Sequence, residues 1–323
     1  MTTRVPFGST GLQVSPVSFG TWQLSPRFWG PQSEDVAIAA MKAAFDLGIN
    51  FYDTADAYGD GLAETVLGRF VAQVPRDEVI ITTKVVHHFN EDATRYPDLS
   101  PENLRTRCDI QLKRLGVDTI DVYLLHSFDP LTPIQSVTNT LNELRQAGKI
   151  RHYGVSNFNV EQHRAMRTAG SYEVTQPPYS LLERGIEEDL LPYCESENVG
   201  VMVYSPMHKG LLTGKYDGSE TFSDFREHHA DFKGERFRAI CAAVQSLQPL
   251  AEKYGISLYQ LILAATLEHP AVQVAIVGIK TAEQIREAAA VMGQCIERPD
   301  CFAIRQALTL APSRIQDASG GRK

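Results

Sequence analysis

The strongest constraint on the fold is an alternation of short apolar runs and helical segments that repeats eight times along the chain. Each apolar run has the length of a strand, and each is followed by a segment with helical periodicity. Eight successive strand–helix units predict a closed (β/α)8 barrel of parallel strands, a TIM barrel of the α/β class. The predicted strands span residues 14–21, 50–54, 79–84, 119–126, 150–156, 173–176, 200–205 and 272–277.

Residues that begin and end helices support the same pattern. Ser33 and Ser100 precede helical segments as N-caps, Pro101 takes a first helical position, and Gly48 and Gly148 follow helix ends. The predicted helices span residues 34–47, 62–71, 101–115, 133–147, 160–168, 186–197, 234–254, 257–267 and 281–292.

The remaining segments predict additions to one barrel. Residues 4–14 predict an N-terminal β-hairpin, and the long polar segment 214–233 predicts a binding loop at the carboxyl-terminal face. We expect residues 1–323 to form a single domain. The alternative is a doubly wound open sheet, which usually has a glycine-rich turn after its first strand. Here that turn reads Gly20-Thr21-Trp22, and the similar stretch at 59–64 lacks a third glycine.

Composition excludes several classes of partner. The net charge of −8 and the low isoelectric point, near 5.6, argue against nucleic acid or an anionic membrane as the main partner. No apolar run is long enough to span a bilayer, and five cysteines without a C-x-x-C pair suggest a reducing, cytoplasmic location. Two adjacent histidine pairs, His87-His88 and His228-His229, lack a carboxylate at helical spacing, so we expect no metal. We expect residues 317–323 to fray.

Four polar residues end successive apolar runs or lie just beyond them: Asp53, Tyr58, Lys84 and His126. In a barrel, the carboxyl ends of the strands form one mouth, so we expect these side chains to cluster there. The alternative is four unrelated polar residues that cap strands. A nearby ammonium lowers the pKa of a phenol, so Lys84, held by Asp53, would make Tyr58 a better general acid. Such a group moves a proton and needs a separate hydride donor.

These four residues, in this order, resemble the catalytic tetrad of the aldo-keto reductases. Further stretches match the family's cofactor motifs: Gly154–Phe158 resembles its nicotinamide-binding motif, and Gln176–Ser180 matches the segment whose glutamine holds the carboxamide. Tyr204–Pro206, which continues into Gly210–Tyr216, resembles the stacking aromatic residue and the pyrophosphate loop. Gly278–Lys280, with Gln284 and Glu287, resembles the adenosine-phosphate site. The likeness covers nearly the whole chain and is greatest to bacterial members.

The resemblance implies an NADPH-dependent oxidoreductase that reduces an aldehyde or ketone, with Tyr58 as general acid and His126 orienting the substrate. Lys280, which follows the last predicted strand and precedes a helix, would meet the 2′-phosphate of the cofactor; the alternative is a solvated surface lysine. The implied cofactor-binding residues are Gly20, Thr21, Trp22, Asp53, Ser156, Asn157, Gln176, Tyr204, Ser205, Pro206, Met207, Gly210, Lys215, Gly278, Lys280, Gln284 and Glu287. The implied substrate-binding residues are Trp22, Trp29, Tyr58 and His126.

The sequence departs from the family pattern in two places, and two other functions stay open. Glu287 is followed by Ala288 where the family often has asparagine, and Met207-His208-Lys209 replaces the usual small residues. The family likeness extends to potassium-channel β-subunits, a nucleotide-binding regulatory class, but these typically have asparagine where His126 stands. A lyase or isomerase with a Schiff base on Lys84 is the other alternative. The carbonyl substrate, the physiological direction and the oligomeric state are not predicted.

Overall fold

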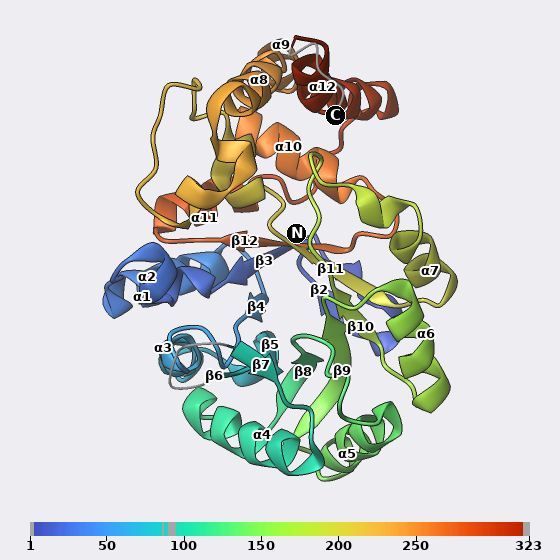
Figure 1. Ribbon diagram of the computed structural model, residues 1–323. Coiled ribbons are helices and arrows are strands. Elements are labelled where there is room, and N and C mark those ends of the chain that lie inside the picture. Colours follow the sequence, from blue (N-terminus) through green and yellow to red (C-terminus); the bar gives the residue numbers. More distant parts are fainter. Residues whose placement is uncertain (1–2, 86, 90–94, 319–323) are drawn as a thin grey trace.

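The computed structural model describes residues 3–85, 87–89 and 95–318, and it shows the predicted closed barrel of eight parallel strands (Figure 1). The last barrel strand pairs with the first, so the sheet has no free edge. In order around the barrel the strands are β3 (Val17–Gly20), β4 (Phe51–Asp53), β5 (Ile80–Val85), β8 (Ile120–Leu125), β9 (Ile150–Ser156), β10 (Val174–Gln176), β11 (Gly200–Tyr204) and β12 (Val274–Gly278).

Helices surround the barrel on its outer side (Figure 1). The N-caps predicted at Ser33 and Ser100 are both present, because each side chain accepts a hydrogen bond from the N–H three residues later. The helices that follow the barrel strands are α2 (Glu34–Asp46), α3 (Leu62–Val71), α4 (Pro101–Leu115), α5 (Ile134–Gln146), α6 (Val160–Ala169), α7 (Leu190–Ser196), α8 (Gly234–Gln245), α9 (Gln248–Tyr254), α10 (Leu258–Leu267) and α11 (Ala282–Ala289).

Proline explains two of the boundaries that the sequence analysis placed wrongly. The predicted strand 14–21 is two strands, since Val14 belongs to the hairpin strand β2 (Gln13–Val14) and β3 begins only after Pro16. The predicted helix 234–254 is broken into α8 and α9, with Pro249 in the first turn of α9, where its missing N–H is tolerated.

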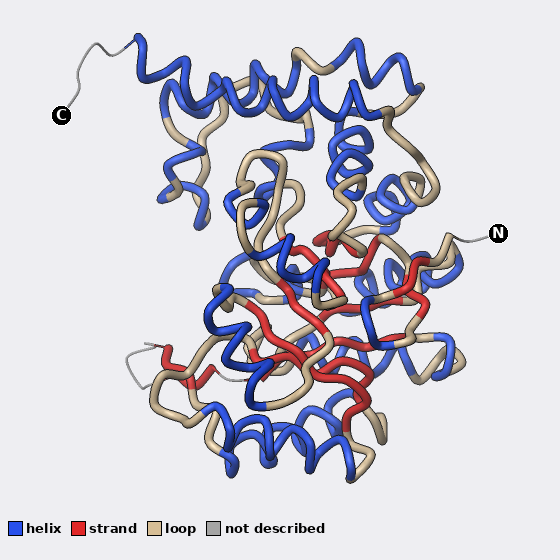
Figure 2. Tube along the Cα trace, turned by 90° about the vertical axis from the view of Figure 1, so that its right-hand side faces the viewer, coloured by secondary structure: helices blue, strands red, loops and turns tan. Residues whose placement is uncertain are grey.

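Some elements were not predicted at all. They are the short helix α1 (Pro26–Trp29), the two-stranded hairpin of β6 (His87–Phe89) and β7 (Arg95–Pro97), and the long helix α12 (Arg298–Ala318). Helix α12 packs along α8 (Figure 1, Figure 2). It buries Ile304 and Leu308, and Cys301 and Ala307 pack against the core beside them, at a helical spacing from which we predicted no helix. Residues 317 and 318 belong to this helix, and residues 319–323, for which we also expected fraying, lie outside the described residues.

The bottom of the barrel is closed by the N-terminal hairpin of β1 (Val5–Pro6) and β2, as predicted. Phe7 lies between these two strands and packs edge-on against Phe51 of β4, with their ring centres 5.4 Å apart. The interior below the mouth is filled by apolar side chains, including Val122, Leu124 and Met202. The barrel is therefore open only at the carboxyl ends of its strands.

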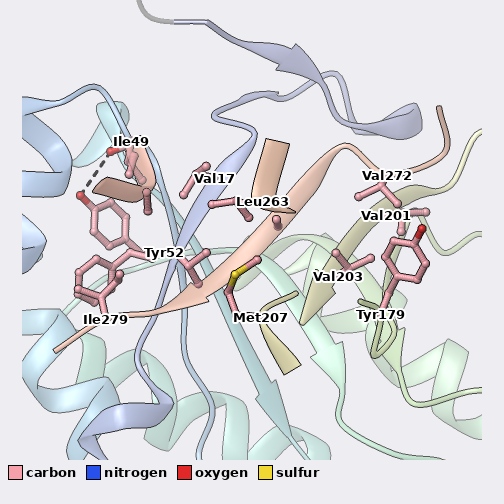
Figure 3. Close-up of a cluster of buried hydrophobic side chains, with 14 of the residues drawn as sticks. Val17, Ile49, Tyr52, Tyr179, Val201, Val203, Met207, Leu263, Val272 and Ile279 are labelled. Carbon is pink, nitrogen blue, oxygen red and sulfur yellow. Dashed lines mark hydrogen bonds between the residues drawn. The ribbon is translucent and has the colours of Figure 1, made fainter. Parts of the chain in front are cut away.

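Side chains on the outer face of the strands anchor the surrounding helices (Figure 3). Tyr52 of β4 is fully buried, and its hydroxyl donates to the carbonyls of Met41 and Ile49 at 3.0 and 3.3 Å. Val201 and Val203 of β11 lie in the same core as Leu263 of α10 (Figure 3). This packing fixes where each strand ends, and so where the polar residues at the strand ends lie. No helix in the described ranges is long and apolar enough to cross a membrane.

Candidate active site

A large cavity of about 2200 Å³ opens at the carboxyl ends of the strands. All but one of the predicted catalytic residues, and all but one of the predicted cofactor residues, line it. The predicted site residues that line it are Gly20, Trp22, Trp29, Asp53, Tyr58, His126, Ser156, Asn157, Gln176, Tyr204, Ser205, Pro206, Met207, Gly210, Lys215, Gly278, Lys280, Gln284 and Glu287.

The two exceptions lie just behind the wall of the cavity. Lys84 is fully buried beneath Asp53 and Tyr58. Thr21 is also buried, and its hydroxyl donates to the backbone carbonyl of Asp53 at 2.9 Å. Thr21 thus fixes the end of β4, and its contact with a cofactor stays a prediction.

The proton site is centred on the ammonium group of Lys84. Its Nζ donates to both carboxylate oxygens of Asp53 and to the carbonyl of Thr54, all at 2.8 Å, and it lies 3.3 Å from the hydroxyl of Tyr58. Burial raises the pKa of Asp53 and lowers that of Lys84, and the attraction between the two groups opposes both shifts. The hydrogen bonds that satisfy both charges hold the pair in one geometry.

The expectation that Tyr58 has a lowered pKa was wrong, because other groups outweigh Lys84. Burial raises the pKa of Tyr58 well above its usual value, and the nearby carboxylates of Asp53 and Asp56 raise it further. The positive charge of Lys84 favours the phenolate, but the carboxylate of Asp53 at 2.8 Å offsets much of that charge, so the pKa stays high. Tyr58 therefore keeps its proton through the neutral pH range, as a proton donor must.

His126 faces the phenol from the adjacent strand end. It follows β8, where its N–H donates to the carbonyl of Val85 at 2.9 Å. Its ring lies edge-to-face with that of Tyr58, with centres 6.1 Å apart. The two side chains therefore border the same part of the cavity, where both can reach one substrate oxygen.

A chain of hydrogen bonds joins the ends of three further strands. Asn157, just after β9, donates to the carbonyl of His126 at 2.8 Å and accepts from the hydroxyl of Tyr204 at 2.8 Å. The hydroxyl of Ser156 donates to the carbonyl of Gln176, also at 2.8 Å. These bonds arrange an amide, a hydroxyl and an aromatic ring along one wall, which suits a flat polar ring such as a nicotinamide.

Gln176 also contacts the proton site directly. Its Nε2 donates to Oδ1 of Asp53 at 2.8 Å, so its amide orientation is fixed by the buried carboxylate. The sequence analysis assigned Gln176 to a carboxamide contact and did not predict this bond. The bond links the wall that suits the nicotinamide to the residue that positions Lys84.

Backbone strain is concentrated around the cavity. Six non-glycine residues of the described chain have positive φ, and four of them line the cavity: Asp60, Asn157, Ser205 and Lys209. Such conformations cost on the order of 1–3 kcal/mol each and occur most often at functional sites. Gly210 follows Lys209 with φ of 93°, a value that a side chain would disfavour. The loop after β11 thus has a strained, close turn where a pyrophosphate group was predicted.

The far end of the cavity is positively charged. Lys280 follows β12, and its N–H donates to the side chain of Gln284 at 2.7 Å. Its ammonium lies 5.1 Å from the ring centre of Trp29. Burial and the nearby charges of Arg226 and Lys215 lower the pKa of Lys280, while Asp224 opposes the shift. This group of cations at one end of the cavity suits an anionic ligand group.

The sequence analysis missed several residues that close over this end. Phe225 packs against Trp29 and Trp22, with ring centres 5.1 and 5.6 Å away. Arg226 donates to the hydroxyl of Tyr216 at 2.7 Å and forms an ion pair with Asp224. Phe225 and Arg226 lie in the aperiodic segment 214–233. The only feature of the sequence that could have pointed to them as site residues is their type, an aromatic residue and a cation, within a predicted binding loop.

His208 and Asp231 join the beginning and the end of the long loop between β11 and α8. Nε2 of His208 lies 2.8 Å from Oδ2 of Asp231, and Arg236 contacts the other carboxylate oxygen. Nitrogens of His229 lie 3.2 Å from the ammonium of Lys209 and 3.3 Å from the N–H of Asp231. His208, His229 and Asp231, whose side chains are of types that can bind a metal ion, lie close together. The spacing of these residues in the sequence did not predict this cluster. Arg236 already contacts a carboxylate oxygen of Asp231, and Lys209 contacts a ring nitrogen of His229. We therefore interpret the group as a cross-link within the loop between β11 and α8.

Comparison with known proteins places this barrel in a family. The model of the aldo/keto reductase family matches residues 16–300. The chain belongs to the aldo-keto reductase family. It is therefore an enzyme of a family that acts on carbonyl and alcohol groups. This excludes the open-sheet alternative, which the closed barrel had already excluded.

Individual aldo-keto reductases match over nearly their full length. The chain is 32% identical to an NADH-specific methylglyoxal reductase of Escherichia coli, over 94% of this chain and 97% of the relative. The glycerol dehydrogenase AKR11B4 of Gluconobacter oxydans has a TM-score of 0.89 at 33% identity, with 95% of each chain covered. An aldo/keto reductase of Klebsiella pneumoniae, in complex with NADP and acetate, has a TM-score of 0.75 at 27% identity, with 95% of each covered.

Proposed function

We propose that this aldo-keto reductase uses NADPH to reduce an aldehyde or ketone, with Tyr58 as the general acid. One observation carries the proposal: a buried ion pair of Asp53 and Lys84 lies against the hydroxyl of Tyr58, which borders the cavity. A catalytic proton donor must be protonated, fixed in place and within reach of substrate. Tyr58 meets the first two requirements through burial and its contact with Lys84, and its place in the cavity wall meets the third.

The residues of the cavity suit a nicotinamide dinucleotide. Asn157, Ser156 and Gln176 would hold the carboxamide, and Tyr204 would pack against the nicotinamide ring. The strained turn at Gly210 would admit the pyrophosphate, with Lys215 beside it. When bound, the nicotinamide supplies the hydride that no side chain can provide.

The protein's own part in the reaction is to move one proton. Tyr58 donates its hydroxyl proton to the carbonyl oxygen of the substrate and is left as a phenolate. The ammonium of Lys84, 3.3 Å away, stabilises that developing negative charge, and Asp53 keeps the ammonium in place. His126 donates a hydrogen bond to the same oxygen and so orients the carbonyl group. Solvent returns a proton to Tyr58 after the alcohol leaves.

The preference for NADPH over NADH rests on the cations at the far end of the cavity. Lys280 would pair with the 2′-phosphate, with the N-terminus of α11 behind it. The Klebsiella structure contains NADP, whereas the Escherichia coli relative is named NADH-specific, so the family uses both cofactors. In this chain Lys280, Arg226 and Lys215 favour the phosphorylated form.

A two-part assay tests the proposed function. First, NADPH and NADH are titrated by their fluorescence, and we expect tighter binding of NADPH. Second, a panel of aldehydes, ketones and sugars is screened for loss of NADPH absorbance. Turnover of at least one carbonyl would support the reductase. Tight NADPH binding without turnover of any carbonyl would instead favour a regulatory role of the channel-subunit type.

A further inference from the structure

Asp56 is a buried carboxylate that the mechanism above does not use. It lies in the turn between Asp53 and Tyr58, and only 4% of its surface is exposed. Its backbone N–H donates to the carbonyl of Lys84 at 3.3 Å, which places it beside the proton site. Neither carboxylate oxygen has a hydrogen-bond partner of normal geometry in the described chain, although the N–H of Ala57 comes near enough to favour its charge weakly.

Glu64 shows how unusual this arrangement is. It is also fully buried, on α3, but its Oε1 accepts hydrogen bonds from Thr83 and Gln111, both at 2.7 Å. Its other oxygen pairs with Arg114 at 3.2 Å. Glu64 is therefore fixed as a hydrogen-bonded carboxylate, whereas the carboxylate of Asp56 lacks such partners, so hydrogen bonding favours neither of its protonation states strongly.

The charged side chains that act on Asp56 lie on α3 and α4. Burial and the carboxylate of Glu64 raise the pKa of Asp56 to about 7, while Arg107 and Arg114 of α4 oppose the shift. In turn, ionised Asp56 raises the pKa values of Tyr58, Lys84 and Tyr123. A proton on Asp56 is thus coupled to the proton on Tyr58.

We propose that Asp56 is a positioning residue that gains and loses a proton beside Tyr58 and Lys84, and so sets how readily Tyr58 donates its own proton. Protonated Asp56 is neutral and leaves Tyr58 a stronger acid. Ionised Asp56 repels the developing phenolate and makes Tyr58 a weaker acid. Carbonyl reduction should therefore slow as the pH rises through the neutral range. This inference rests on the proposed function, because it assumes that Tyr58 is the donor.

The decisive variant is Asp56→Asn, which keeps the shape of the side chain and removes its charge. The rate of NADPH oxidation in a single turnover, measured from pH 5.5 to about 9, should fall with an inflection near neutral pH in the wild type. In Asp56→Asn the inflection should vanish, and the rate at the alkaline end should exceed that of the wild type by roughly threefold to tenfold. Structural damage would lower the rate and so cannot mimic this gain. An unchanged inflection in the variant would overturn the proposal.

Glu64→Gln serves as a second variant with a different expected result. It removes the charge that raises the pKa of Asp56, so the inflection should move to lower pH rather than vanish. If the inflection in the pH profile of Glu64→Gln stayed at the wild-type pH, the coupling between Glu64 and Asp56 would be contradicted.

Infrared difference spectra of the cofactor-free protein, recorded across the same pH range, test the proton directly. A band of protonated carboxyl that is lost on titration, and is absent in Asp56→Asn, is the expected result. A difference spectrum without such a band would overturn the proposal. If the wild type reduced no carbonyl, the proposed function would fail, while these spectra would still decide whether Asp56 binds the proton.

Discussion

The proton site and the cofactor end of the cavity are built in different ways. Asp53 and Lys84 lie within barrel strands, are almost fully buried and bond directly to each other. The residues over the cofactor end lie in long loops and are joined by side chains across those loops, as in the pair of His208 and Asp231. The strands fix the chemistry, and the loops determine what is bound.

This difference predicts two separable classes of variant. Changes to the proton site, at Asp53, Tyr58 or Lys84, should abolish the chemical step while leaving cofactor affinity nearly intact. Changes in the loops should weaken the cofactor while leaving the rate of hydride transfer from a saturated enzyme nearly intact. A proton-site variant that mainly weakened cofactor binding, or a loop variant that mainly slowed hydride transfer, would contradict this division.

The largest effect is expected for Lys84→Met. Without the ammonium nothing stabilises the phenolate of Tyr58, so turnover should fall by at least about 10²–10⁴-fold. The buried carboxylate of Asp53 loses its partner, which should lower the free energy of unfolding by about 3–5 kcal/mol. Single-turnover kinetics and urea unfolding measure the two effects.

The double variant Asp53→Asn with Lys84→Met is the matched control. Because it removes both charges, it should recover much of the lost stability and none of the lost turnover. Recovery of both would mean that Lys84 acts only through the fold.

Lys280→Ala is expected to give the next largest effect, on binding alone. Loss of a charge-assisted contact with a 2′-phosphate costs about 1.5–3 kcal/mol, or roughly ten- to a hundredfold in NADPH affinity. NADH affinity should change little. Lys233→Ala, which removes an exposed lysine from the neighbouring loop, should leave both affinities unchanged. Equal losses for NADPH and NADH in Lys280→Ala would exclude the phosphate contact.

A smaller effect is expected for Asp231→Asn. The change weakens the contacts of Asp231 with His208 and Arg236, which hold the end of the loop between β11 and α8 against its beginning and against α8. We expect NADPH to bind roughly threefold to tenfold more weakly through faster dissociation, since part of a charge-assisted bond is lost. Stopped-flow release of NADPH measures this rate.

The control for Asp231→Asn is Glu227→Gln, which removes an exposed charge from the same segment. It should leave the dissociation rate of NADPH at the wild-type value. If Asp231→Asn slowed hydride transfer and did not change NADPH release, the loops would take part in the chemistry and the comparison would fail.

The same difference explains what the sequence predicted well. Asp53, Tyr58, Lys84 and His126 were grouped correctly because the carboxyl ends of parallel strands meet at one face of a barrel. Strand positions follow from apolar runs, which are local features of the sequence. The residues at those strand ends could therefore be placed in one mouth without knowledge of any loop.

The loops could not be predicted in the same way. Phe225 packs on Trp29 from nearly 200 residues away, and the segment around Phe225 has no periodic pattern. The direction of the pKa shift of Tyr58 was also missed. It depends on burial and on the close balance between Lys84 and Asp53, and neither is visible in the spacing of residues.

The central claim is that Tyr58 gives its proton to the substrate, and Tyr58→Phe tests it most directly. The substitution removes one oxygen and keeps the ring, while the proposed cofactor contacts lie on other strands. NADPH titration by fluorescence and single-turnover carbonyl reduction should be measured on the same preparation. We predict NADPH affinity within about twofold of the wild type and a loss of reduction of about 10²–10⁴-fold. Wild-type reduction by this variant would contradict the claim.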